Sequence, residues 1–175
     1  YSALSFSPDC AFLALAGHDD SITVMSVDNF SVIRCIGHKS FVSRAIFQSI
    51  PFNTRDNSDE AKVKAFTKQN SIRIIGGGLD GQLSVFEINK EDFNDERAQL
   101  TKSRSVNMNE LENPIEIKPL VMHKCEDAVG WVEIADDLLF VCTLDGGLTT
   151  YKIQSASDVD INSESPNVSK EKKVC

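Results

Sequence analysis

The sequence predicts an all-β fold: part of a β-propeller with about three four-stranded antiparallel blades, the last of which lacks its fourth strand. A hairpin pattern occurs three times, and in each copy an Asp stands at the turn, six residues before a large side chain. Apolar and polar residues alternate along these segments, as in strands with one buried face. Asp and Gly at the turns suit tight β-connections. The three hairpins are GHDDSITVMS (17–26), GLDGQLSVFE (78–87) and TLDGGLTTYK (143–152), with turn residues Asp19, Asp80 and Asp145.

Other strand patterns surround each hairpin and give every unit the same order. An alternating segment precedes the hairpin, an apolar run leads into the turn, and a fourth segment follows in the first two units. The third unit ends after its hairpin, so a fourth strand is missing there. In chain order these segments are SALSFS (2–7), FLALAG (12–17), SVIRCI (31–36), VSRAIFQ (42–48), IRIIGG (72–77), IEIKPLVM (115–122), VGWVEIAD (129–136) and LLFVCT (138–143).

Two polar insertions, at about 49–70 and 89–114, lengthen the connections between strands. They explain why the turn Asp residues are 61 and 65 residues apart, whereas a four-stranded blade commonly takes about 40–45 residues. The insertions are either loops exposed to water or arms that bind a partner, since long loops on a rigid scaffold often carry function. Only the stretch around 89–112 has helical composition, and it lacks a sustained apolar face.

The ends of the chain add two expectations. Residues 1–154 are predicted to form the blades, whereas 155–175 is rich in Ser, Asp and Asn and then becomes basic. Such a segment cannot bury enough apolar surface to order itself, so a disordered tail is predicted. Because the chain begins with Tyr1 and stops after the third strand of a unit, we expect it to be the C-terminal part of a longer protein.

The composition excludes several classes of protein. The formal net charge of −8 argues against binding to a nucleic-acid backbone, and no basic stripe offsets it. No apolar run approaches the roughly 20 residues of a membrane helix, so no membrane association is predicted. The five cysteines are odd in number and lack CxxC spacing, which favours reduced thiols. Reduced thiols predict a cytoplasmic or nuclear location.

No pattern of catalytic or metal-ligating residues stands out. His18, His38 and His123 lie in different units without a neighbouring Cys at ligand spacing, so no metal site is predicted. The Gly-rich stretch IIGGGLDGQ (74–82) lacks a following Gly-Lys-Ser/Thr, and turn glycines explain it better than a phosphate loop. Nothing marks one Cys as an activated nucleophile. The sequence therefore predicts neither an enzyme nor a cofactor nor a small-molecule substrate.

Two His–Asp pairs are predicted to stabilise the units. Gly37-His38 precedes the first strand of the second unit, and Asp80 lies in the hairpin turn of that unit. Both positions fall at the same end of an antiparallel four-stranded sheet, so a hydrogen bond from the imidazole to the carboxylate is expected. His123 and Asp145 stand in the same relation in the third unit. We interpret both pairs as structural.

Gly-His before a first strand, with a turn Asp six residues before a large side chain, resembles the WD-repeat propellers. The Trp-Asp dipeptide itself is replaced by Met25-Ser26, Phe86-Glu87 and Tyr151-Lys152. Over about 2–154 the chain is similar to one subgroup: WD-repeat-containing protein 20, the dystrophia myotonica WD-repeat protein and the fungal CreC catabolite-repression proteins. The unbroken GHKSFVS (37–43) and the hairpin GLDGQLSVFE are the most specific parts of this resemblance.

This resemblance implies a non-catalytic scaffold that binds a ubiquitin-specific protease and raises its activity, with a second WD-repeat protein as a further partner. The alternative is a WD-repeat adaptor in another assembly, such as a ubiquitin-ligase substrate receptor or an RNA-processing complex. Both functions are compatible with a rigid propeller face, because a preorganised surface loses little conformational entropy on binding.

The predicted partner-binding residues lie at the end of the sheets that carries Gly-His and the hairpin turns. Phe41 follows His38 by three residues and is either a lid on the core between blades or an exposed anchor. Large aromatic side chains are enriched among interface hot spots, which favours testing the anchor. Lys39, Asp20 and Glu126 are further candidates from the same end. Trp131 lies within a strand pattern and is predicted to be part of the core.

Overall fold

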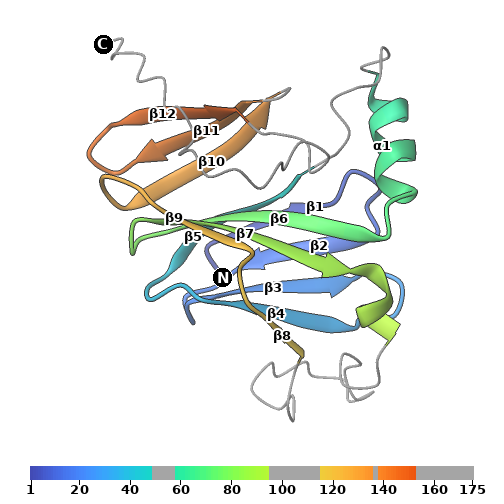
Figure 1. Cartoon of the computed structure of the whole chain (residues 1–175). Coiled ribbons are helices and arrows are strands. Elements are labelled where there is room, and N and C mark those ends of the chain that lie inside the picture. The colour runs from blue at the N-terminus through green and yellow to red at the C-terminus, as the bar shows by residue number, and fades with distance from the viewer. Residues whose placement is uncertain (49–57, 95–114, 136–137, 153–175) are drawn as a thin grey trace, which may run out of the picture.

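The computed structural model describes residues 1–48, 58–94, 115–135 and 138–152 (Figure 1). These ranges contain twelve strands in three sheets, together with one α-helix and one 3-10 helix. All strand pairs are antiparallel except one, and no sheet is closed on itself. The predicted all-β class is confirmed.

The three sheets follow one another along the chain, except that β8 returns to the edge of the first sheet. The first has the order β1 (Ala3–Phe6), β2 (Phe12–Ala16), β3 (Ser21–Ser26), β4 (Val32–Ile36) and β8 (Ile115–Ile117). The second has the order β5 (Val42–Gln48), β6 (Ser71–Gly78), β7 (Gln82–Asn89) and β9 (Val121–Lys124). The third has the order β10 (Val129–Ala135), β11 (Leu138–Thr143) and β12 (Leu148–Lys152).

The second sheet is covered on both faces. One apolar cluster packs between it and the first sheet, and a second cluster packs between it and the third sheet. Its central strand β6 therefore reads as an almost continuous apolar run instead of a strict alternation. Large members of the first cluster are Ile22, Val24, Ile33, Ile72, Ile74, Phe86 and Ile88, and members of the second are Ile46, Ile75, Leu83, Val129, Val132 and Val141.

The two junctions between sheets are built alike. In the first sheet, the Ser2 hydroxyl donates to the carbonyl of Val42, which opens the second sheet. In the second sheet, the Ser43 hydroxyl donates to the carbonyl of Val129, which opens the third sheet. The first strand of the second sheet, β5, therefore contacts the first strand of each neighbouring sheet, β1 on one side and β10 on the other.

The segment predicted as one strand at 115–122 is divided between two sheets. Ile115–Ile117 pairs in parallel with β4 in the first sheet, and Val121–Lys124 pairs antiparallel with β7 in the second. Pro119 lies between the two strands and has no N–H for a ladder, while Leu120 N donates to Val85 O at 2.7 Å. The single fourth strand of the prediction was wrong, because the chain crosses from one sheet edge to the next.

A helix occupies part of the first insertion, which the sequence indicated as a polar loop. Helix α1 (Asp59–Thr67) begins at Ser58, whose side chain accepts a hydrogen bond from Ala61 N. Its Phe66 is fully buried and packs edge-to-face against Phe47, with ring centroids 6.3 Å apart. This part of the insertion is therefore a helix that contributes one buried side chain to the core.

The second insertion begins with the 3-10 helix η1 (Lys90–Asn94), whose Phe93 packs against Phe12 with ring centroids 4.9 Å apart. The remaining insertion residues, 49–57 and 95–114, lie outside the described residues, and so does the tail predicted to be disordered. Within the described ranges, no helix has the length and apolar character that a membrane crossing requires.

Trp131 does not belong to the core, contrary to the prediction. Its side chain is 47% exposed, and the Arg44 guanidinium lies 4.0 Å from the ring centroid. The register of β10 shifts between Val129 and Trp131, so that Val129 and Val132 both face the second sheet. A bulge of this kind moves a side chain to the other face of the sheet.

Candidate interaction surface

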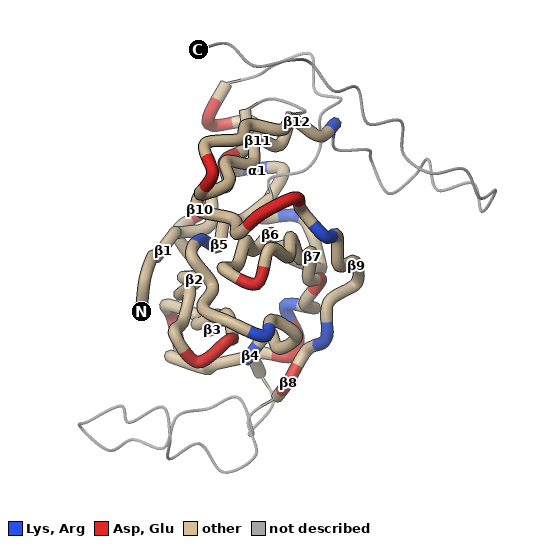
Figure 2. Tube along the Cα trace, turned by 90° about the vertical axis from the view of Figure 1, so that its left-hand side faces the viewer, with Lys and Arg blue, Asp and Glu red and all other residues tan. Residues whose placement is uncertain are grey.

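Three hairpin turns and two linkers between sheets meet at one end of the molecule, which we call the loop face. It comprises residues 17–20, 37–41, 79–81, 125–128 and 144–147, and Figure 2 views it end-on. Four backbone hydrogen bonds connect these loops in sequence. They are Val42 N to Gly17 O (3.1 Å), Leu79 N to Phe41 O (2.8 Å), Cys125 N to Gly81 O (2.8 Å) and Leu144 N to Ala128 O (2.9 Å). The loop face is therefore one connected surface.

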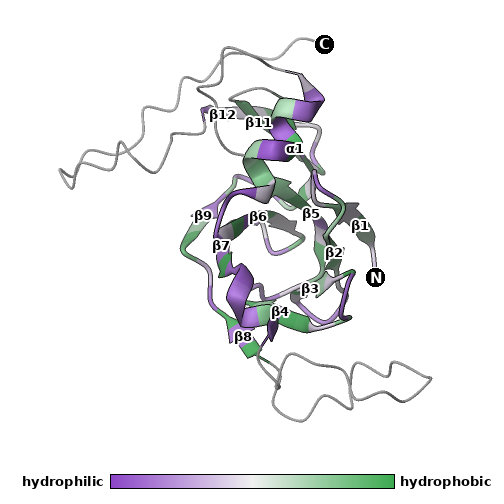
Figure 3. Ribbon diagram, turned by 90° about the vertical axis from the view of Figure 1, so that its right-hand side faces the viewer, coloured by the Kyte–Doolittle hydropathy of each residue, from purple (hydrophilic) through white to green (hydrophobic). Residues whose placement is uncertain are grey.

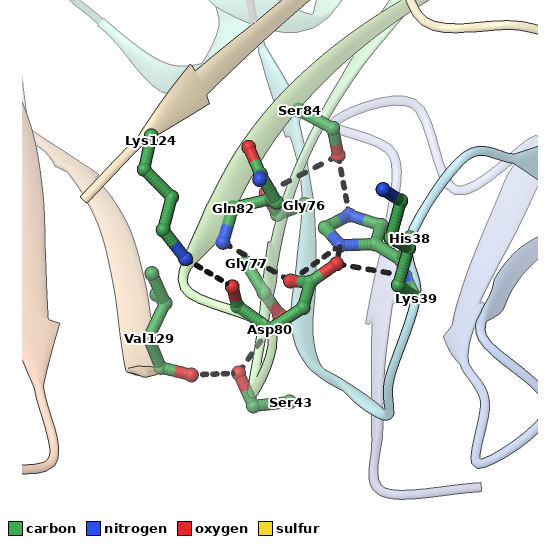
Figure 4. A network of polar contacts seen from close by, with 10 residues as sticks. All are labelled: His38, Lys39, Ser43, Gly76, Gly77, Asp80, Gln82, Ser84, Lys124 and Val129. Carbon is green, nitrogen blue, oxygen red and sulfur yellow. Dashed lines mark hydrogen bonds and ion pairs between the residues drawn. The ribbon is translucent and has the colours of Figure 1, made fainter. Parts of the chain in front are cut away.

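His38 and Asp80 form the centre of a polar network beneath this face (Figure 4). His38 Nδ1 lies 3.2 Å from Asp80 Oδ1, and Nε2 lies 2.7 Å from Ser84 Oγ. Because a carboxylate only accepts, Nδ1 is the donor to Asp80. The backbone N–H groups of Lys39 and Gln82 donate to the same carboxylate at 2.8 and 3.0 Å. The contact expected from the Gly-His position is thus present, and it ties the linker after β4 to the second hairpin.

The surroundings of the Asp80 carboxylate stabilise its ionised form. Burial by itself would raise the pKa of Asp80, but hydrogen bonds from Lys39 N, the His38 ring and Gln82 N outweigh it. The pKa of Asp80 is therefore below its usual value. The side chain of His38 is fully buried and that of Asp80 is 8% exposed, so the pair is shielded from water.

Two glycines of the stretch 74–82 allow neighbouring side chains to approach the backbone closely. A Cβ on Gly78 would lie 2.6 Å from both Asp80 Oδ1 and His38 Nδ1. A Cβ on Gly76 would lie 2.4 Å from Ile22 Cδ1 in the first sheet. Contacts this short cannot be accommodated without movement, so glycine is required by the neighbouring side chains.

His123 has a different partner from the one predicted. It lies within β9, where it pairs with Leu83, and its Nε2 is 3.2 Å from the hydroxyl of Tyr151. Asp145 accepts hydrogen bonds inside its own turn, from Gly147 N at 3.0 Å and from Thr143 Oγ1. His38 follows the end of β4, whereas His123 is held inside a strand, and this difference explains why the two relations diverge.

The predicted partner-binding residues all lie on the loop face. Phe41 is 43% exposed, and its ring stacks on His18 with centroids 4.5 Å apart. The side chains of Lys39 and Glu126 are exposed, and Asp20 is half-buried at a turn position with φ 60°. The remaining turn residue of the prediction, Asp19, accepts from Ser21 Oγ at 2.9 Å and from Arg34 Nη2 at 3.0 Å.

Two exposed apolar residues of this face were missed. Leu79 is 38% exposed and Leu144 is 64% exposed, and each directly precedes a turn Asp. In sequence they read as the last residue of an apolar strand. Each of them stands directly before a turn Asp, the position that His18 occupies in the first hairpin. This shared position could have indicated that they lie at the exposed turns.

Besides the buried Asp80, five acidic residues lie in the loops that carry these exposed apolar residues, and Figure 2 shows acidic positions as red stretches of the tube. Lys39 is the basic residue within these loops, and Lys124, at the end of β9, donates from Nζ to Asp80 O at 2.6 Å. An exposed aromatic edged by charge suits recognition of a protein surface. The carboxylates belong to Asp19, Asp20, Glu126, Asp127 and Asp145.

The described residues contain no group of three or more His, Cys, Asp or Glu that could hold a metal ion. Cys10, Cys35, Cys125 and Cys142 are free thiols. Burial raises the pKa of Cys35 to about 12, and burial is also the main cause that raises the pKa of Cys125. Both thiols are therefore protonated and unreactive at neutral pH.

No family model matches this chain, and no curated protein matches it in sequence.

Proposed function

We propose that the chain forms blades of a WD-repeat β-propeller and acts as a non-catalytic scaffold that binds and activates a ubiquitin-specific protease. The observation that carries the proposal is the loop face: five loops joined by backbone hydrogen bonds, with Phe41 exposed among them. The protease as partner follows from the resemblance of GHKSFVS and of the second hairpin to the subgroup named above.

The stacking of the sheets supports the propeller. First strands β1, β5 and β10 lie next to one another, as the inner strands of successive blades would. The outer faces of the first and third sheets carry exposed apolar side chains, which further blades would cover. These side chains are Leu4 and Phe6 on the first sheet and Trp131, Leu138 and Leu148 on the third.

The rigidity of the loop face supports binding of a partner enzyme. The His38–Asp80 network holds the linker that carries Phe41, so the ring is positioned before a partner arrives. A preorganised surface loses less entropy on binding. Such a surface can also shift a partner enzyme toward its active arrangement if it binds that arrangement more tightly.

Replacing Phe41 with Ala should weaken binding of the protease at least about tenfold, because an anchoring ring at an interface centre commonly carries more than 1.4 kcal/mol. The ring is partly exposed, so the fold should remain intact. The measurement is paired: the dissociation constant for the partner and the melting temperature of the same variant. Val63→Ala, on the exposed side of α1 at the other end of the molecule, is the matched control and should change neither.

A loss of melting temperature without an independent change in affinity would make Phe41 a structural lid over His18. Unchanged affinity in a folded variant would remove Phe41 from the interface. The partner itself is tested by recovering proteins bound to the chain and measuring hydrolysis of a fluorogenic ubiquitin substrate with and without it. Recovery of ubiquitin-ligase subunits or RNA-processing factors, with no effect on a protease, would favour the adaptor.

A further inference from the structure

Phe30 is an exposed aromatic residue in an unusual backbone conformation. It lies in the turn between β3 and β4, its φ is 58°, and it is 58% exposed. Positive φ is disfavoured for residues with a Cβ and is an outlier for a bulky side chain, whereas Gly adopts it freely. Since more than half of the residue's surface is exposed, burial does not explain why Phe occupies this position.

Hydrogen bonds on both sides hold the strained turn. Phe30 N donates to Ser26 O at 3.0 Å, and Asn29 Oδ1 accepts from the backbone N–H and the hydroxyl of Ser31 at 3.0 and 2.6 Å. Asn29 Nδ2 also donates to Phe93 O at 3.3 Å, which fastens the turn to η1. Strained residues that the surroundings hold in place are often functional. Here the backbone of the turn is held in place, and Phe30 is open to solvent.

The neighbourhood of Phe30 combines apolar surface with negative charge. Val27 in the same turn is 36% exposed, and its N–H donates to Ala11 O, which brings the turn between β1 and β2 alongside. The carboxylates of these two turns and of the adjoining η1 are Asp9, Asp28, Glu91 and Asp92. This is the end of the molecule opposite the loop face, and Figure 3 views it.

The ammonium group of Lys90, the basic residue of η1, contacts helix α1. Lys90 Nζ donates to Phe66 O at 2.9 Å, at the C-terminal end of α1, and lies 4.9 Å from the centroid of the Phe66 ring. It is therefore directed toward the helix and does not neutralise the four carboxylates. A ligand that carries positive charge would complement these carboxylates of the described residues.

We propose that Phe30 and Val27, edged by these four carboxylates, form a second interaction surface that binds a basic protein segment with apolar side chains. Phe30, on a turn whose backbone is held in place, supplies the apolar anchor, and the carboxylates select Lys or Arg beside it. A second copy of this chain fits less well, because its net charge of −8 would oppose association. The surface lies at the opposite end from Phe41, so this inference does not rest on the proposed function.

The test uses the intact chain and a short fluorescein-labelled peptide of Lys and Leu residues, with binding measured by fluorescence anisotropy. Phe30→Gly should weaken binding at least about tenfold. Its melting temperature should equal or exceed that of the wild type, because Gly adopts the positive φ without strain. Val63→Ala should bind the peptide as the wild type does. A peptide in which Ser replaces Leu should bind more weakly than the Lys/Leu peptide.

Equal affinity of Phe30→Gly and the wild type would overturn the proposal, because the ring would then make no contact. Equal affinity of the Ser- and Leu-containing peptides would also overturn it, since charge alone would explain the binding. Sedimentation that shows a dimer in the wild type and a monomer in Phe30→Gly would assign the surface to a second copy instead. None of these outcomes depends on whether the loop face binds a protease.

Discussion

Replacing Phe66 with Ala should lower the free energy of unfolding by about 3–5 kcal/mol, the usual cost of truncating a buried phenylalanine. The side chain is fully buried, packs edge-to-face on Phe47 and lies under the ammonium group of Lys90. Removing it would leave a cavity between α1 and the second sheet. Chemical denaturation of the wild type and the variant measures this loss.

Val63→Ala is the matched control, because Val63 lies on the same helix and is 37% exposed. Its effect should stay within about 0.5 kcal/mol, as for surface substitutions in general. If Phe66→Ala destabilised the chain no more than Val63→Ala does, α1 would not belong to the core. The segment would then be the solvated loop that its composition indicates.

The hairpins were predictable because their signals are local. Asp19, Asp80 and Asp145 lie at turns in both the prediction and the structure, and the alternation on either side sets which residues face the core. The position of His38 beside Asp80 follows from the same reasoning, since antiparallel connections bring both to one end of the sheet. Local turn chemistry and strand alternation suffice for these features.

The errors arose where distant residues decide the outcome. Helix α1 has a weak apolar pattern, and Phe66 is its one buried residue, so its burial depends on Phe47 and Lys90. The crossing at Pro119 depends on the free edges of two sheets, and the exposure of Trp131 depends on a bulge. Tertiary contacts of this kind override local pattern.

The candidate site was predictable in location and incomplete in membership. Phe41 was found because it follows Gly-His, and its place on the loop face follows from the antiparallel connections. Leu79 and Leu144 were missed because an exposed leucine at the end of a strand has the same sequence pattern as a buried one. The positive φ of Phe30 could not be predicted either. Gly and Asn are the residues that commonly adopt it, and here the Asn stands one position earlier.

Asp80→Ala should destabilise the chain by about 3 kcal/mol, near the upper end of the cost of an unsatisfied buried polar group. The substitution removes the acceptor of the His38 ring and of two backbone N–H groups at once. Asp19→Ala is the control at the equivalent turn, where the side chain is 57% exposed and pairs with Arg34. An exposed ion pair of this kind contributes about 0–1 kcal/mol. If denaturation experiments gave equal losses of unfolding free energy for the two variants, the buried network would stabilise the fold no more than the exposed ion pair does.

The stabilisation by Asp80 should also depend on pH, and Asp80→Asn isolates this dependence. The pKa of Asp80 is lowered in the folded chain, whereas an unfolded Asp titrates at about 3.9. The contribution of the carboxylate is therefore fully present above the unfolded value and is lost as pH falls through the lower folded value. The difference in unfolding free energy between wild type and Asp80→Asn should be constant above roughly pH 5 and should shrink at lower pH. A difference that stays constant down to about pH 2 would mean that the hydrogen bonds at Asp80 stabilise the fold without its charge, and the network would then hold the linker of Phe41 by geometry alone.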